Sequence, residues 1–236
     1  MRVAIIQPSF FPWRGFFDII ASVDLFVFLD DVQYTKRDWR NRNIIKTSVG
    51  PRWLTVPVQA SVKATTICET LIDYSEPFAL QHARQFEAAY RSAPFCGQVK
   101  ELLEETYRER YASIGDLAIA TTANTCRLLG IETPLLRSAK MGVSGAKTDR
   151  LLAILAEVGG STYVSGPSAD GYLDKGAFIE RGIRLEYKNY EYRAYPQLWG
   201  DFLAQVSILD LIANVGEDCM EYLISAPNSV ITEISE

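Results

Sequence analysis

The sequence predicts an α/β protein with a mainly parallel open sheet, helices on both faces of that sheet, and a helical insert or cap. Towards both ends of the 236-residue chain, short apolar runs alternate with amphipathic segments, which favours parallel strands joined by helical crossovers. The stretch from 75 to 130 has helical periodicity instead. Because 48% of the residues are apolar and no linker signal divides the chain, we expect one domain over 1–236 with the insert or cap at 75–130.

The first elements come from apolar runs and their boundaries. Residues 2–6 are apolar and are closed by Gln7 and Pro8, which predicts a buried strand followed by a loop. A helix is expected from about 15 to 21, and a second strand over 24–31 ends in two adjacent aspartates. Residues 53–58 alternate, and Pro57 marks an edge strand or a strand end.

Three helices are predicted in the middle of the chain. The first opens at 75–77, with Ser75 as its N-cap and Pro77 in its first turn. The second starts near Pro94, and the third runs from 116 to 129 and stops at Gly130.

Strand–helix alternation then resumes. We expect strands at 134–139, 161–166 and 183–190, with helices at 148–159 and 175–182. A last amphipathic helix over 202–214 precedes a polar tail.

The composition argues against several classes of protein. No apolar run approaches the roughly 18 residues of a membrane span, and the N-terminal run lacks the features of a signal peptide, so we expect a cytoplasmic protein without a membrane span. The four cysteines form no CxxC pair and there is one histidine, so neither a zinc site nor a disulfide framework is expected. Acid–base chemistry must then rest on His82, carboxylates, lysine or tyrosine.

The loop from Gln7 to Gly15 is the first candidate site. Pro8 and Pro12 stiffen it, and Gly15 at a helix start can bring backbone N–H groups close to an anion. Its aromatic residues are equally typical of a hydrophobic lid. The candidate binding residues here are Gln7, Trp13, Arg14 and Gly15.

The second candidate is a basic segment. Residues 34–46 carry five Lys or Arg and one Asp, a local charge of +4 in a chain whose formal charge is −5. Arginine forks bind phosphate or carboxylate, and Trp39 can stack on a base or sugar ring, which favours an anionic small-molecule ligand such as a nucleotide sugar. The alternative is a solvated face paired with the acidic remainder. The candidate binding residues are Gln33, Lys36, Trp39, Arg40, Asn41, Arg42 and Lys46.

The third candidate is the loop 141–150, which precedes a predicted helix. Lys147 and Thr148 resemble the end of a phosphate loop, although the full GxxxxGK[ST] spacing is absent and a plain capping loop accounts for it equally well. Ser165 and Gly166 end the next strand and are expected on the same rim, unless they form only a tight turn.

Two groups are candidates for catalysis. Asp31, beside Asp30 at a strand end, can orient an amine, hold Mg²⁺ or act as a general base, or both can be turn residues. His82 lies four residues from both Phe78 and Phe86, on an apolar helix face where a core histidine is the alternative to a catalytic one.

Four long stretches of the sequence resemble the WbqC-like family. They are IIQPSFFPWRGFFDIIASVDLFVFLDDVQYTKRDWRNRNIIKT, GAKTDRLLAI, TYVSGPSADGYLD and FLAQVSILDLIANVG, and the similarity spans nearly the whole chain. The resemblance implies a role in surface-polysaccharide or O-antigen biosynthesis and points to most of the candidate residues above, including Asp31, His82 and Lys147.

From this resemblance we expect a cytosolic transferase that modifies a nucleotide- or lipid-linked sugar, by amino-acid (glycine) or acyl transfer. A more distant likeness, to HIGH-type nucleotidylyl transferases, concerns the first loop: both histidines of that motif are missing, and Arg14 stands in the place of a phosphate donor. It implies the alternative of an ATP-using adenylate-forming or nucleotidylyl transferase, with ATP or Mg²⁺ as cofactor.

A third alternative is a non-catalytic adaptor in a glycan-synthesis complex, with exposed aromatics as its interface. A sequence pI of 5.1 argues against extended DNA as a partner, whereas a short RNA end such as aminoacyl-tRNA stays compatible with the basic segment.

Overall fold

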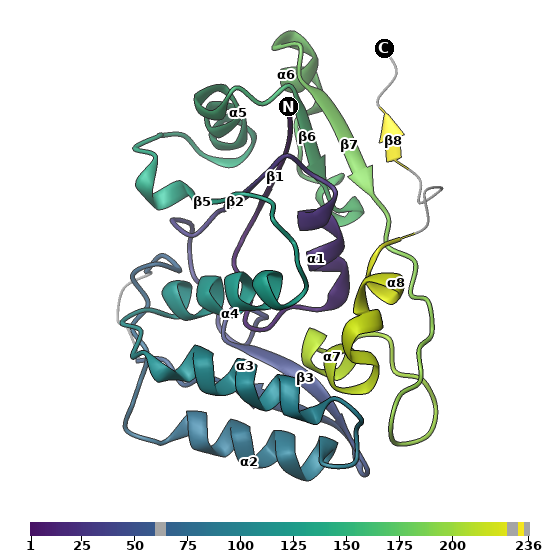
Figure 1. Ribbon diagram of the computed structural model, residues 1–236. Helices are drawn as coiled ribbons and strands as arrows, with labels where there is room; N and C mark the ends of the chain where they lie inside the picture. Colours follow the sequence, from purple (N-terminus) through teal and green to yellow (C-terminus); the bar gives the residue numbers. More distant parts are fainter. Residues whose placement is uncertain (60–64, 226–230, 234–236) are drawn as a thin grey trace.

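The computed structural model describes residues 1–59, 65–225 and 231–233, and its centre is a six-stranded sheet in the order β5-β2-β1-β6-β7-β8 (Figure 1). Strands β5, β2, β1, β6 and β7 are parallel to one another, and β8 is antiparallel to β7. The α/β class and the mainly parallel sheet are therefore confirmed. The bounds are β1 Arg2–Ile6, β2 Leu25–Phe28, β5 Leu135–Arg137, β6 Thr162–Ser165, β7 Arg184–Lys188 and β8 Ile231–Glu233.

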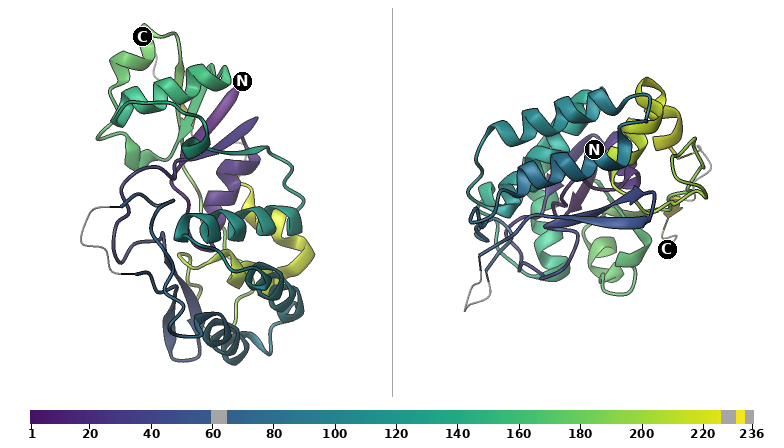
Figure 2. Two further views of the ribbon diagram at one scale, coloured as in Figure 1. Left: turned by 90° about the vertical axis from the view of Figure 1, so that its left-hand side faces the viewer. Right: turned by 90° about the horizontal axis from the view of Figure 1, so that it is seen from below.

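Both faces of the sheet are covered, because successive residues of a strand enter different cores. Val3 and Ile5 of β1 pack into one core with α5 (Lys147–Val158) and α6 (Lys175–Glu180). Ala4, between them, packs into the other with α1 (Arg14–Ala21). The views from the side and from below show these helices on opposite sides of the sheet (Figure 2).

The three helices predicted in the middle of the chain are present as α2 (Phe78–Tyr90), α3 (Cys96–Arg108) and α4 (Ile114–Leu128). They lie next to one another and share the core of α1 (Figure 1). The expected Ser75 cap is wrong: α2 begins only after Pro77, and the Ser75 N–H is bound by the Asp73 carboxylate at 2.9 Å. At the start of α4, the Ser113 hydroxyl accepts the Asp116 N–H at 3.1 Å.

Strand β3 (Arg42–Thr47), which the sequence did not predict, forms an antiparallel hairpin with β4 (Gly50–Thr55). Its inward residues are Asn43 and Ile45, both buried. The Asn43 side-chain amide donates hydrogen bonds to the carbonyl oxygens of Phe10 and Phe11, at 3.2 and 2.8 Å. Residues 42–46 of the basic segment therefore belong to a strand attached to the first loop.

The last predicted helix is shorter than expected. Helix α7 (Ile208–Val215) begins after Ser207, whose hydroxyl accepts the Leu209 N–H at 3.3 Å and donates to the Phe11 carbonyl at 2.8 Å. Residues 202–206 are not helical. The stretch predicted as a polar tail contains helix α8 (Cys219–Leu223) and strand β8, and its residues 226–230 and 234–236 lie outside the described residues.

Short 3-10 helices complete the described elements at η1 (Ser138–Lys140), η2 (Pro167–Ala169) and η3 (Gly216–Asp218). Within the described ranges, we find no helix with the length and apolar character needed to cross a bilayer.

Candidate functional site

A large cavity opens at the carboxyl ends of three adjacent strands, β2, β1 and β6. The chain leaves β1 for α1 on one face of the sheet, and after β6 it continues to α6 on the other face. The two loops diverge and leave a crevice between them, which is where open α/β sheets bind ligands. The position of the cavity thus follows from the strand order.

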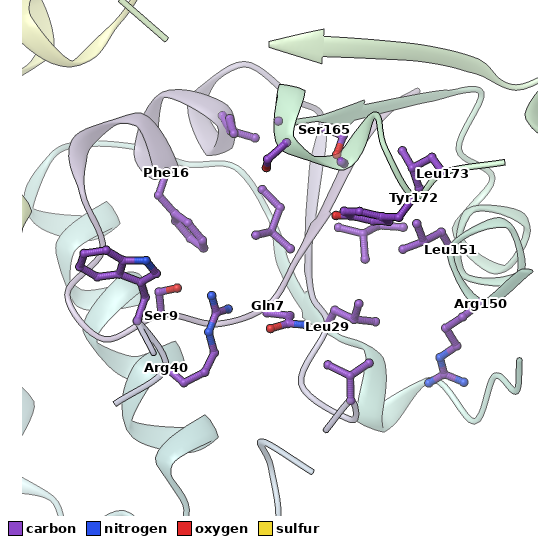
Figure 3. Close-up of a pocket in the computed structure, with 18 of the residues that line it drawn as sticks. Gln7, Ser9, Phe16, Leu29, Arg40, Arg150, Leu151, Ser165, Tyr172 and Leu173 are labelled. Atoms are coloured by element: carbon purple, nitrogen blue, oxygen red, sulfur yellow. The ribbon is translucent and has the colours of Figure 1, made fainter. Parts of the chain in front are cut away.

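The cavity is large enough for a ligand of several rings. Its volume is about 1540 Å³, whereas pockets for drug-sized molecules span roughly 300–1,000 Å³. Arg40 and Ser9 lie on one side of it, Leu151 and Tyr172 lie on the other, and Gln7 lies between them (Figure 3).

The Arg40 side chain is directed into the hollow (Figure 3). One guanidinium nitrogen, Nη1, donates to the Pro8 carbonyl at 3.1 Å, and Nε, which is buried, has no hydrogen-bond partner. Burial lowers the pKa of Arg40 from its ordinary value, and the Asp38 carboxylate, 3.6 Å from Nε, acts in the opposite direction. An arginine stays protonated under such conditions, so the cavity contains an incompletely paired cation.

Asp31, the predicted catalytic carboxylate, also lines the cavity. One of its oxygens accepts a hydrogen bond from the Ser138 hydroxyl at 2.6 Å, and the other forms an ion pair with Arg150 of α5. Its neighbour Asp30 is fully buried and binds two nitrogens of Arg137, at 2.8 and 2.7 Å. The adjacent aspartates therefore differ, since Asp30 is structural and Asp31 faces the hollow.

Aromatic side chains line the wall near Arg40. The rings of Trp13 and Tyr192 stack with 5.4 Å between their centroids, and both line the cavity, as does Trp39. Gly15 has a packing role here, because a Cβ at this position would lie 2.0 Å from Cζ3 of Trp13. The glycine allows the indole to lie over the start of α1.

The other two predicted loops reach the same cavity. Ser144 to Lys147, at the start of α5, and Ser165 with Gly166, at the end of β6, line it. The Thr148 hydroxyl instead accepts the Asp174 N–H, at 3.0 Å, and is not among the lining groups. The structure thus places residues of both loops along one cavity.

Nine of the candidate residues thus meet at one cavity, and the others do not line it. Those that line it are Gln7, Trp13, Asp31, Gln33, Trp39, Arg40, Lys147, Ser165 and Gly166, and those that do not are Arg14, Gly15, Lys36, Asn41, Arg42, Lys46, His82 and Thr148.

Buried polar candidates outside the cavity bind the protein itself. Arg14 donates to the carbonyl oxygens of Arg193 and Tyr222, at 2.6 and 3.1 Å, and four aromatic rings lie within 5.5 Å of its guanidinium carbon. Lys46 donates to Gln197 Oε1 at 2.9 Å and Asp201 O at 2.5 Å, and Asn41 donates to the Val56 carbonyl at 2.8 Å.

His82 is enclosed in the core. Its two ring nitrogens bind the Tyr107 hydroxyl at 2.8 Å and the Thr55 carbonyl at 3.0 Å, and burial lowers its pKa to about 4. His82 is therefore placed as a core histidine and not as a catalytic one. Both ring nitrogens have hydrogen-bond partners, and the ring does not line the cavity.

Several residues that line the cavity were not among the candidates predicted from the sequence. Tyr192 and Gln205 come from the irregular segment between β7 and α7, and Arg150 and Tyr172 come from the regions around α5 and η2. Tyr192 could have been suspected from its place on a loop, since binding residues are disproportionately found on loops.

Comparisons with known proteins agree over almost the entire chain. An uncharacterized protein of Mycobacterium tuberculosis (strain ATCC 25618 / H37Rv), Rv1507c, is 44% identical over 225 residues, which cover 94% of this chain and 97% of that protein. No solved structure shows significant similarity. The family match extends over residues 7–222, from the first cavity loop to α8, and the chain therefore belongs to the WbqC-like protein family.

Proposed function

We propose that the protein is a transferase whose cavity binds a sugar linked to a nucleotide or lipid through a diphosphate. The observation that carries this proposal is the meeting of the Arg40 cation, the Trp13 and Tyr192 rings and the Asp31 carboxylate in one cavity of about 1540 Å³. A diphosphate-linked sugar has a matching set of groups: two anionic phosphates, one or two rings and hydroxyls.

Each part of the ligand has a place in this scheme. Arg40 binds a phosphate through the nitrogens that Pro8 does not occupy, and Lys147 adds positive charge at the start of α5. Trp13 and Tyr192 stack on a ring of the ligand.

Asp31 accepts the proton of the attacking amine or hydroxyl. The new bond joins that atom to the carbon of the transferred acyl or aminoacyl group, and the bond from this carbon to its carrier breaks. Arg150 and Ser138 position the carboxylate, because each of them contacts one of its two oxygens. Neither side chain takes part in the proton transfer.

The binding step is tested with UDP-N-acetylglucosamine, UDP-glucose, GDP-mannose, dTDP-glucose and ATP as probes. A probe that binds the folded state raises the melting temperature, and calorimetry then gives its Kd. Arg40→Met should weaken binding of a sugar nucleotide by about ten- to hundredfold, because one charge-assisted contact is lost. The matched control is Arg52→Met, which removes an exposed arginine that does not line the cavity.

Equal Kd values for wild type and Arg40→Met would contradict the proposed phosphate contact. A response to ATP alone, with pyrophosphate release, would replace the proposal with the adenylate-forming alternative. If no probe bound and a glycosyltransferase co-purified with the chain, the adaptor alternative would replace it.

A further inference from the structure

Two half-exposed tryptophans continue from the mouth of the cavity onto the hairpin. The ring centroids of Trp39 and Trp53 are 5.3 Å apart with an interplanar angle of 39°, and the two residues are 42% and 39% exposed. Tryptophan is highly buried on average, so two adjacent exposed rings are unusual. Trp39 lines the cavity and Trp53 does not, so the pair leads from inside the site to the outer surface.

Positively charged side chains lie on the same segment as Trp39 and next to the Trp53 ring. The Arg42 guanidinium carbon lies 4.1 Å from the centroid of the Trp53 ring, and Arg42 also donates to the Arg37 carbonyl. Lys36 and Arg37 are exposed, and neither forms an ion pair within the part of the chain that the structure describes. We call Trp39, Trp53 and Arg42 the tryptophan strip.

We propose that the tryptophan strip binds a sugar chain carrying at least one acidic group, as the outer part of the ligand whose diphosphate lies at Arg40. This inference rests on the proposed function and makes it more specific, because the substrate is then an oligosaccharide and not a single sugar. The apolar faces of pyranose rings pack on indole rings, and Arg42 supplies a partner for a carboxylate.

Charge decides between this occupant and single-stranded nucleic acid. A polynucleotide carries a phosphate for every base and needs a continuous series of cations. Here net positive charge is concentrated in the segment 34–46, at +4, and the rest of the chain carries a formal charge of −9, which repels a polyanion. A sugar chain with isolated acidic groups can contact the two indole rings and Arg42, and it is repelled less because it carries fewer negative charges.

The test is calorimetry of the full chain with a hyaluronan tetrasaccharide, which alternates acidic and neutral rings, and with neutral N-acetylchitotetraose and hexauridylate as comparisons. We expect the hyaluronan tetrasaccharide to bind most tightly, and Trp53→Ala to weaken it about tenfold. Trp53→Phe should restore part of the affinity, since it retains an aromatic face. Val49→Ala, at the 91% exposed tip of the same hairpin, is the matched control and should bind like wild type.

UDP-N-acetylglucosamine in the same variants separates the two proposals. If it binds in an Arg40-dependent manner while no tetrasaccharide binds, or while Trp53→Ala binds the tetrasaccharide like wild type, the tryptophan strip proposal is wrong and the proposed function stands. Tighter binding of hexauridylate than of the acidic tetrasaccharide overturns the choice of occupant. If Arg40→Met leaves UDP-N-acetylglucosamine binding unchanged while Trp53→Ala weakens tetrasaccharide binding, the proposed phosphate contact fails and the strip stands alone.

Discussion

The guanidinium of Arg150 forms an ion pair with the carboxylate of Asp31, and this pair connects the first turns of α5 to the residues that follow β2. Both side chains are partly shielded from water, at 11% and 22% exposure. The pair therefore joins two of the segments that form the cavity, and we expect it to contribute to the stability of the fold.

Arg150→Ala is expected to lower the free energy of unfolding by about 2 kcal/mol, because a hydrogen-bonded charge pair is lost and Asp31 stays partly buried. Urea denaturation measures this change. Asp31→Asn should cost less, since the amide keeps an oxygen that accepts from Arg150. An unchanged free energy of unfolding in Arg150→Ala would show that the pair contributes nothing to stability.

Arg137→Ala is expected to be more destabilising, by about 3–5 kcal/mol, because it leaves the fully buried Asp30 carboxylate without a cationic partner. The matched control is Arg127→Ala, which removes an exposed ion pair with Glu105 and should cost at most about 1 kcal/mol. Denaturant unfolding of both variants gives the comparison, and similar costs for the two would contradict the structural role assigned to Asp30.

Stability should fall in mild acid because of His82. Burial lowers its folded-state pKa to about 4 from an ordinary value of 6.5, so the unfolded chain binds a proton in this window that the folded chain does not. The free energy of unfolding contributed by His82 is therefore complete above pH 6.5 and declines as the pH falls towards 4, by at most about 1.4 kcal/mol per pH unit.

His82→Gln removes this titration and should give a flatter dependence of stability on pH between 6.5 and 4. Since His82 is the single histidine of the chain, its ring protons also report the pKa directly by NMR in the wild-type protein. An ordinary pKa in that titration would show that the ring is accessible to solvent.

Gly15→Ala should disturb the aromatic wall of the cavity. The added Cβ would overlap the Trp13 ring, so the indole must leave its stack on Tyr192. We expect altered tryptophan fluorescence and weaker binding of a sugar nucleotide. Gly97→Ala on α3, where an added Cβ meets nothing within 4 Å, is the control and should stabilise the fold by up to about 1 kcal/mol. Unchanged fluorescence in Gly15→Ala would contradict the packing role of Gly15.

Local patterns in the sequence predicted much of the central sheet. The run 2–6 and the run ending at Asp30 and Asp31 have the composition of buried parallel strands, and both form them. The loops that follow these strands meet because parallel strands have their carboxyl ends at the same edge of the sheet. The alternation of strands and helices in the sequence is enough to predict this. Asp31, Lys147 and Ser165 were found in this way.

The basic segment shows where local patterns fail. Its charges suggested a ligand-binding loop, yet Arg42 to Thr47 is a strand, and Lys46 binds carbonyl oxygens of the segment 200–201. A buried lysine and an exposed one have the same sequence signature, because the partner lies more than 150 residues away. The same reason applies to Arg14, whose acceptors come from the last part of the chain.

The hydrogen bonds of Asn43 and Ser207 to the carbonyl oxygens of Phe10 and Phe11 have a kinetic consequence. These bonds lie within the protein and attach the loop 7–13 to two distant segments, so little conformational freedom is left there for a ligand to remove. Association should then follow a single exponential whose rate rises linearly with ligand concentration, without a slow closing phase. The amides of Phe10 and Phe11, which donate to Trp39 O at 3.0 Å and Thr121 Oγ1 at 3.1 Å, should exchange slowly with deuterium in the free protein.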